Sequence, residues 1–308
     1  MTFNPNADIR SSNVTRGGGG GGFPGGGGRR GGGVAIGGGA GGCLLVVLLI
    51  GYTILGGNPL DLLGGGDTGG GAPVVHGGAL QECQTGAAAN NRDDCLVQAT
   101  IESDDSLWAK LAPANGIRFT EPNGVVFSGQ TNTGCGPATS ATGPFYCPAD
   151  ATIYIDTSFY QELQSRFGSD GGQLAKMYVV AHEYGHHIQN LDGTLSRANH
   201  NDTGPQGEMV RLELQADCYA GVWAHHASST TDAEGRPMLE PLTREDVASA
   251  LSAAAAVGDD HIQRDVSGGR VRPDTWTHGS SQQRESWFTR GLDKGTMQAC
   301  DTFAAPEV

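Results

Sequence analysis

Glycine is concentrated in one part of the chain, and this limits where a hydrophobic core can form. Of the 51 glycines among the 308 residues, 29 fall within the first 78 positions. Glycine has no side chain to bury, and its backbone loses more entropy on ordering than that of any other residue. We therefore expect one folded domain over residues 79–303, a length typical of a single domain.

The region before this domain is predicted to contain a disordered tail and a membrane anchor. The first 33 residues are dominated by glycine and polar side chains, a composition typical of disorder. Residues 34–57 carry no charge and are long enough for one transmembrane helix. Because the strongly apolar part, residues 43–55, is shorter, a cleaved signal peptide is the alternative. Arginines before this stretch favour a cytoplasmic tail, a single pass through the cell membrane and a domain outside the cytoplasm, with residues 58–78 as a flexible linker.

Six cysteines follow the predicted anchor, and their number suggests disulfides. An even number in an exported domain favours disulfide bonding, although six cysteines can pair in fifteen ways. Closeness in the sequence favours Cys83–Cys95 and Cys135–Cys147, which leaves Cys218 and Cys300 as the third pair. Buried free thiols are the alternative. Because these cysteines form no CxxC pair, we do not expect cysteine to bind zinc in this protein.

The hydrophobic pattern of residues 79–303 predicts a small sheet followed by several helices. Two short apolar runs on either side of residues 122–124 indicate two strands joined by a turn, and residues 151–163 begin as a strand and end as a helix. Further helices are expected over residues 92–111, 171–191, 206–228, 243–264 and 280–292. The fold class is therefore a helix-rich α+β domain. A net charge of −14 argues against binding to nucleic acid, which requires basic patches.

The segment VVAHEYGHHIQ, residues 179–189, has the spacing of a zinc site. His182 and His186 are separated by four positions, so both imidazoles lie on one face of a helix, with Glu183 beside them. A catalytic zinc takes three protein ligands and keeps one position open for water. The spacing therefore supplies two ligands and a candidate base, and a third ligand has to come from elsewhere.

Two acidic residues could supply the third ligand. Asp192 falls at the third-ligand position of the HExxHxxGxxH/D pattern, but Gln189 replaces the glycine that lets the chain turn there. Glu213 and Asp217 share one face of the predicted helix 206–228, which is otherwise largely apolar. A buried acid needs a partner or a metal, so we expect Glu213 to complete the site and Asp217 to hold a ligand imidazole by its distal nitrogen. Acids on the surface of the helix are the alternative.

Two further histidines, His187 and His278, differ in their expected roles. His187, next to the second predicted ligand, is expected to pack or cap rather than bind metal. His278 lies between Trp276 and Gly279, directly before a predicted helix, and this setting makes it a candidate functional residue.

Taken together, four motifs resemble a bacterial family described as "putative neutral zinc metallopeptidase". They are VVAHEYGHHIQ, LELQADCYAGVW, AAVGDDHIQ and THGSSQQRESWF, behind a glycine-rich tail and one predicted anchor. The fold of this family looks like that of the gluzincin group, which includes the HtpX-like and CAAX-prenyl proteases. That group has HExxH, then an ExxxD helix, then a histidine followed six residues later by an arginine. Relatives often have proline after this histidine, where the present chain has Gly279.

The resemblance implies a zincin-like fold and a role for each matching residue. The implied zinc ligands are His182, His186 and Glu213. Glu183 is implied as the base, and Asp217 as the acid that holds a ligand imidazole. His278 and Arg284 match the histidine and the arginine of the last motif, called the late motif below.

The implied activity is that of a membrane-anchored zinc endopeptidase that acts on a protein or peptide. In such an enzyme Glu183 takes the proton from a zinc-activated water that attacks the peptide carbonyl. His278 is the candidate donor to the developing oxyanion. The alternative is a catalytically silent exported module that binds zinc and acts in binding or assembly. The presence of Glu183 argues against this alternative, because a structural zinc site needs no base.

Overall fold

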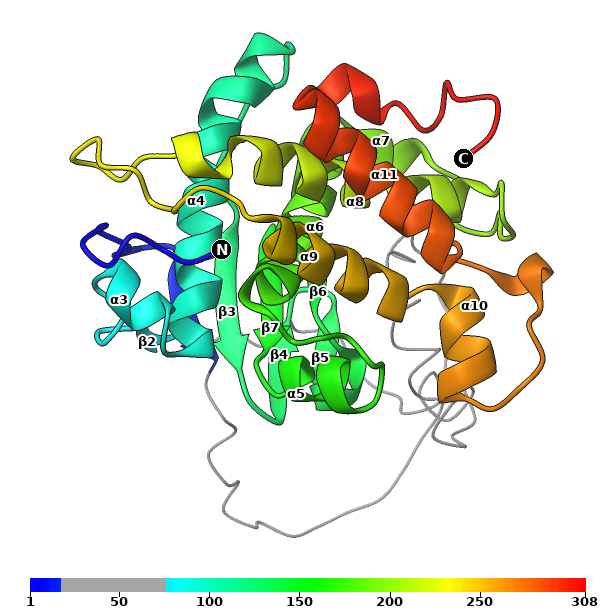
Figure 1. Ribbon diagram of the computed structural model, residues 1–308, viewed down its shortest axis with the longest axis horizontal. Helices are drawn as coiled ribbons and strands as arrows, with labels where there is room; N and C mark the ends of the chain where they lie inside the picture. The colour runs from blue at the N-terminus through cyan, green and yellow to red at the C-terminus, as the bar shows by residue number, and fades with distance from the viewer. Residues whose placement is uncertain (18–75) are drawn as a thin grey trace, which may run out of the picture.

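A five-stranded mixed sheet forms one layer of the described part of the chain, residues 1–17 and 76–308 of the computed structural model (Figure 1). Its strands, in spatial order, are β2 (His76–Ala79), β1 (Val14–Gly17), β3 (Asn123–Phe127), β7 (Thr152–Asp156) and β6 (Phe145–Cys147). The three central strands run parallel to one another, and both edge strands run antiparallel to their neighbours. A separate hairpin pairs β4 (Gln130–Thr133) with β5 (Gly136–Thr139).

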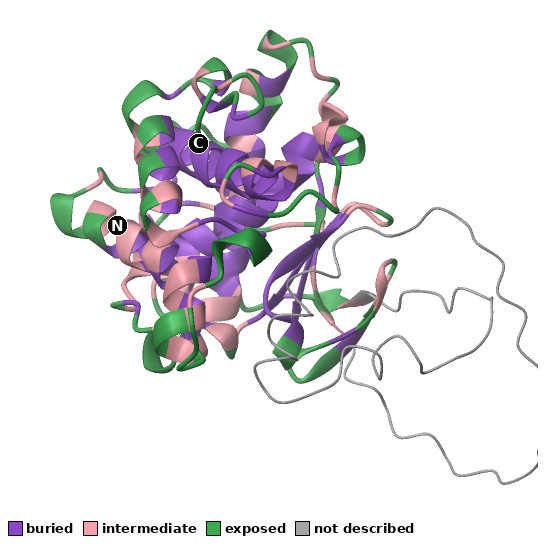
Figure 2. Cartoon of the chain, turned by 90° about the vertical axis from the view of Figure 1, so that its right-hand side faces the viewer, coloured by how far each residue is buried: buried purple, intermediate pink, exposed green. Residues whose placement is uncertain are grey.

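Helices account for most of the remaining structure, and α6 is central among them. The longer helices are α4 (Asp93–Ala114), α5 (Phe159–Ser165), α6 (Gln173–Leu191), α8 (Glu208–His226), α9 (Arg244–Ala256) and α11 (Ser281–Lys294). The short ones are α3 (Gly86–Ala89), α7 (Thr194–Arg197) and α10 (Asp259–His261). α6 packs against α4, α8 and α9, while α11 runs beside α8 (Figure 1). Buried residues gather in these central helices and in the sheet (Figure 2). The described residues therefore form a helix-rich α+β fold with a small mixed sheet, as expected.

The predicted helix over residues 243–264 is interrupted. α9 ends at Ala256, α10 begins at Asp259, and a π-helical turn covers Ile262–Val266. The break turns the carboxylate of Asp259 towards the loop at residues 277–279, where it accepts three backbone N–H groups. A single continuous helix would not direct the Asp259 side chain towards this loop. The contact between Asp259 and residues 277–279 therefore accompanies the break in the helix.

The predicted strand pair around residues 122–124 is wrong. Residues 117–122 form no strand, and Asn123 and Gly124 begin β3 instead of forming a turn. β3 is hydrogen-bonded to β1 on one side and to β7 on the other, so neither edge is free for a hairpin partner. The local turn signal is overridden by pairing with strands that are distant in the sequence.

Residues 1–17 belong to the fold, and the prediction of a disordered tail is wrong for them. Phe3, Ile9 and Val14 are fully buried, and β1 lies between β2 and β3 in the sheet. These apolar residues precede the glycine run, so the average composition of the first 33 residues concealed them.

The rest of the predicted N-terminal region lies outside the described residues. This applies to residues 18–33 of the tail, to the anchor at 34–57 and to residues 58–75 of the linker, which stay predictions. Within the two described segments, no helix combines the length and the hydropathy needed to cross a membrane.

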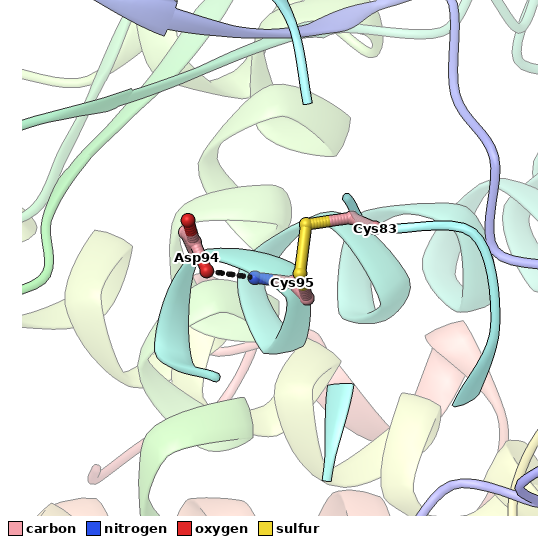
Figure 3. Close-up of side chains that lie close together, drawn as sticks. All are labelled: Cys83, Asp94 and Cys95. Atoms are coloured by element: carbon pink, nitrogen blue, oxygen red, sulfur yellow. Dashed lines mark hydrogen bonds between the residues drawn. A yellow bond between two sulfur atoms is a disulfide. The ribbon is translucent and has the colours of Figure 1, made fainter. Parts of the chain in front are cut away.

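All three predicted disulfides are present in the structure. They are Cys83–Cys95, Cys135–Cys147 and Cys218–Cys300, and the last joins α8 to the turn Met297–Cys300. Figure 3 shows the first pair beside Asp94, whose carboxylate accepts the backbone N–H of Cys95 at 2.9 Å. Cys83, Asp94 and Cys95 lie close enough to suggest a metal site. Because the two sulfur atoms are bonded to each other, this cluster has no thiolate to offer a metal.

The pairing of the N-terminal segment can be tested with an engineered disulfide between Asp8 and Thr85. These residues form an antiparallel bridge, in which Ile9 donates its N–H to Gln84 and Gly86 donates to Ala7. Asp8 and Thr85 therefore lie directly opposite each other as a non-hydrogen-bonded antiparallel pair. Such pairs have Cα atoms about 4.5 Å apart, within the range of a disulfide.

We expect Asp8→Cys combined with Thr85→Cys to form this disulfide in the purified full-length chain, as detected by mass mapping without reductant. Arg10→Cys with Thr85→Cys is the matched control, since diagonal neighbours are about 7–8 Å apart and lie beyond disulfide range. Equal cross-linking in both variants would show that residues 1–17 are not held as the structure describes.

Candidate metal centre

Three buried side chains from α6 and α8 converge at one point. His182 Nε2 lies 3.2 Å from one carboxylate oxygen of Glu213, and His186 Nε2 lies 3.6 Å from the other. All three residues are less than 8% exposed. Among the described residues, they form one of two groups whose donor atoms are close enough to share a metal ion, and the other is the disulfide cluster at Cys83. The structure therefore brings together the three residues that were predicted as ligands.

Gly185 allows the two helices to approach closely at this point. It lies on α6 between the two histidines, and a Cβ atom placed on it would be 3.0 Å from both Cα and the carbonyl oxygen of Ala216 on α8. Such a contact is tighter than almost all real Cβ contacts, so a larger residue would push α8 away. The glycine inside the motif thus helps Glu213 to reach both imidazoles.

The hydrogen bonds behind the two imidazoles fix which nitrogen faces Glu213. Asp217 Oδ1 lies 2.8 Å from His182 Nδ1, and Gln189 Oε1 lies 2.8 Å from His186 Nδ1. Both acceptors favour the tautomer with its proton on Nδ1, which leaves a lone pair on each Nε2.

Two imidazole nitrogens and a carboxylate are a donor set of zinc sites. In a tetrahedral zinc site, bonds of about 2.0–2.2 Å place the ligand atoms about 3.3–3.6 Å apart. The observed separations of 3.2 and 3.6 Å, each to a different oxygen of Glu213, are close to this spacing, and one donor atom from each residue lies within 4.8 Å of the others. The geometry of the donors therefore fits zinc.

The charge balance of the cluster also favours a cation. Burial lowers the pKa of His182, but Asp217 and Glu213 on its two sides have the larger, opposite effect. The net result is a pKa raised to about 10. Burial raises the pKa of Glu213, but His186 and His278 bring it below its ordinary value. The cluster on its own thus holds charged carboxylates and attracts a proton. A divalent cation at the same place would supply that positive charge.

Asp217 is held by donors from two other helices. Arg284 of α11 donates from Nε and from Nη2, each at 2.8 Å, and the hydroxyl of Tyr178 on α6 donates to the same carboxylate as His182. Asp217 is fully buried and Arg284 is 3% exposed. Burial raises the pKa of Asp217, but Arg284 and His182 lower it to about 2, so it stays ionised. The acid expected to hold a ligand imidazole does lie behind His182, and Arg284 of the late motif supports it.

Glu183 lines a cavity of about 430 Å³ together with the three candidate ligands and His278. Its side chain makes no hydrogen bond to the described residues around it, and burial raises its pKa above the ordinary value. A carboxylate with a raised pKa is better matched to proton transfer near neutral pH. The position and the electrostatics of Glu183 are therefore those of a candidate base.

The loop that carries His278 is anchored by Asp259. One carboxylate oxygen of Asp259 accepts the N–H groups of Thr277, His278 and Gly279 at 2.7–3.0 Å. Gly279 has φ = +87°, which proline cannot adopt because its ring fixes φ near −65°. The conformation of the loop thus favours glycine at this position and excludes proline. Burial lowers the pKa of His278, but Glu213 and Asp259 raise it above its ordinary value, which favours the form that can donate from both ring nitrogens.

Sequence reasoning missed two residues of the site, Gln189 and Asp259. Besides accepting from His186, Gln189 donates to the carbonyl of Leu212 at 2.8 Å and to Gln215 at 3.0 Å. Gln215 in turn donates to the carbonyl of Cys300. In the sequence, Gln189 stands out only because it replaces a glycine, although its position three residues after His186 puts both on one helix face. Asp259 lies in the AAVGDDHIQ motif, which was recognised without a role.

The structure keeps Asp192 and His187 away from the candidate metal centre. Asp192 follows the last residue of α6, accepts the N–H of Thr194 at 2.7 Å, and lines a different cavity. His187 is hydrogen-bonded to the carbonyl of Thr120 and to the hydroxyl of Tyr146. Burial lowers the pKa of His187 to about 4, so it is neutral, and it packs in the core as expected.

The sequence of the chain is similar to a family model and to two uncharacterized bacterial proteins. The model of the family described as "Putative neutral zinc metallopeptidase" matches residues 6–303. The uncharacterized protein Rv2575 of Mycobacterium tuberculosis (strain ATCC 25618 / H37Rv) is 53% identical over 236 residues, which cover 76% of this chain and 79% of the relative. The uncharacterized protein YpfJ of Escherichia coli (strain K12) is 41% identical over 230 residues, covering 72% and 76%. No solved structure matches the chain. The chain belongs to the family described as "putative neutral zinc metallopeptidase".

Proposed function

We propose that this protein is a zinc-dependent endopeptidase in which His182, His186 and Glu213 hold the metal. The observation that carries the proposal is the pair of imidazoles with both Nε2 atoms facing a buried carboxylate, beside a second carboxylate, Glu183, that lines an open cavity. The description of the family supports the same reaction class. Zinc, when bound, would supply a Lewis acid that lowers the pKa of a water towards neutrality and polarises the peptide carbonyl.

The residues around the metal then have separate tasks. The carboxylate of Glu183 accepts a proton from the attacking water and later gives it to the leaving amine. His278 donates an N–H to the oxyanion that develops on the peptide carbonyl, and Asp259 holds its loop in place. Asp217 and Gln189 keep the two ligand imidazoles oriented with Nε2 towards the metal. Two observations support these tasks: Glu183 and His278 line the cavity, and Asp217 and Gln189 contact the two imidazoles.

Membrane attachment through residues 34–57 is a separate proposal, which rests on the uncharged apolar run in the sequence. A single crossing would place residues 1–17 and 76–308 on opposite sides of the bilayer. Pairing of β1 with β3 requires both segments on the same side. One molecule therefore cannot have a single crossing and the described sheet at once, and the Asp8–Thr85 cross-link distinguishes the two arrangements.

The choice of the third ligand leads to a prediction on metal content. Glu213→Ala should reduce the zinc in the purified full-length protein from about one ion per chain to almost none, because two neutral imidazoles alone hold the metal weakly. Asp192→Ala is the matched control and should leave the zinc content unchanged, since Asp192 lines a different cavity. Metal analysis of both variants checks this. Zinc lost from the Asp192 variant and kept in the Glu213 variant would contradict the assignment.

The contact between Gln189 and His186 leads to a prediction on metal affinity. Gln189→Leu should weaken zinc binding roughly 10 to 100-fold, because His186 loses the acceptor that fixes its tautomer. Gln189→Glu keeps an acceptor and should lie closer to wild type. Competition with a chelator of known affinity measures the effect, and thermal unfolding with saturating zinc confirms that the variants are folded. Wild-type affinity in the leucine variant would exclude this role.

The decisive test of the proposed function is Glu183→Gln. This variant keeps the size of the side chain and removes the base, so zinc content should be unchanged while kcat/KM on unstructured peptides falls by about 10²–10⁴-fold. A chelator should abolish cleavage by the wild-type protein, and added zinc should restore it. If wild type and variant cleave equally, contamination explains the activity. If neither cleaves any peptide while both hold zinc, the endopeptidase proposal is wrong.

A further inference from the structure

The cavity beside the candidate metal centre extends into a region with apolar walls. Besides the residues of the site, its lining includes the apolar residues Phe159, Phe167, Val179, Val257 and Ile262. At about 430 Å³, it falls within the range of pockets that bind small molecules or side chains, about 300–1,000 Å³. Catalysis at the metal requires none of these five side chains, so their presence calls for another explanation.

The apolar walls begin next to the reacting groups. Val179 lies four residues before Glu183 on α6, so both side chains are on the same helix face. The carbonyl of Val257 accepts a hydrogen bond from Arg284, which also holds Asp217 behind His182. A peptide whose scissile bond is at the metal would therefore have a neighbouring side chain within reach of this region.

Two aromatic side chains, Phe159 and Phe167, form part of the apolar region. The rings of Phe159 and Phe167 are 6.2 Å apart between centroids, and both are half-buried. His261 is hydrogen-bonded to the carbonyl of Phe167, which ties the segment after α5 to α10. Two charged residues, Glu162 and Arg166, also line the cavity, and the exposed Arg166 places its guanidinium over the Phe167 ring. The apolar side chains are thus already gathered in one cavity, which these two charged residues also line.

We propose that this apolar region is a specificity pocket that binds a large apolar side chain, such as Leu, Phe or Met, on a residue adjacent to the scissile bond. The proposal rests on the proposed endopeptidase function and adds the class of substrate. Leu, Phe or Met entering this pocket would be removed from water against Val179, Val257 and the two phenylalanines. A charged side chain would lose its hydration against the same walls. Substrates with a bulky apolar residue at this position are therefore favoured.

The test uses the zinc-loaded full-length protein and a peptide library in which the residues on both sides of each bond vary. We expect the cleavage sites to share a large apolar residue on one fixed side, with kcat/KM at least about tenfold above that for Asp or Gly at the same position. Cleavage without such a preference would contradict the proposed specificity pocket but not the proposed endopeptidase function. Absence of any cleavage would instead count against the proposed function, and the pocket would fall with it.

Variants at Phe159 connect the preference to the pocket. Phe159→Asp places a carboxylate in the wall and should reduce kcat/KM for apolar sites by about tenfold or more, while raising it for Lys or Arg at the same position. Phe159→Ala enlarges the pocket and should shift the preference towards Trp. Phe119→Asp is the matched control, because Phe119 is also half-buried but does not line the cavity. Zinc content should be unchanged in all three variants. The same change in preference in the Phe119 variant, or no change at Phe159, would overturn the proposal.

Discussion

The buried carboxylate of Asp217 is the point on which the arrangement of the site depends. A charged group without access to water needs donors around it, and Asp217 receives them from Tyr178 and His182 on α6 and from Arg284 on α11. Three helices are therefore fixed relative to one another by a single side chain. Breaking a buried ion pair of this kind costs about 3–5 kcal/mol, because the remaining partner is left charged and uncompensated. The orientation of His182 and the stability of the helix packing thus share one cause.

Parts of this arrangement follow from local sequence, and parts do not. The spacing of His182 and His186, and of Glu213 and Asp217, fixes which side chains share a helix face, so both halves of the centre were predictable. Two disulfides join cysteines only 12 positions apart, and closeness in the sequence was sufficient to pair them. The support of His186 by Gln189 depends instead on contacts with Leu212 and Gln215 on another helix. No periodicity within one segment can reveal which side chain a second helix will present.

The same distinction explains the errors in the predicted sheet. β1 pairs in parallel with β3, which lies more than 100 positions later in the sequence, and β3 pairs in parallel with β7. Parallel strands need a long connection, so no hairpin signal announces them. The Asn123–Gly124 dipeptide has the local chemistry of a turn, but pairing on both sides of β3 keeps it in a strand. Composition was equally misleading for residues 1–17, because the glycine run that follows dominated the average.

The sheet connects the N-terminal segment to the cavity. β1 supports β3, β3 supports β7, and β7 leads directly into α5, whose first residue, Phe159, lines the apolar region. On the far side of β7, the edge strand β6 contributes Phe145 and Tyr146 to the same cavity. Loss of β1 would leave one edge of β3 without its hydrogen bonds and would remove the buried side chain of Val14 from the core. The residues before the glycine run therefore stabilise, through two intervening strands, the wall that we propose selects the substrate.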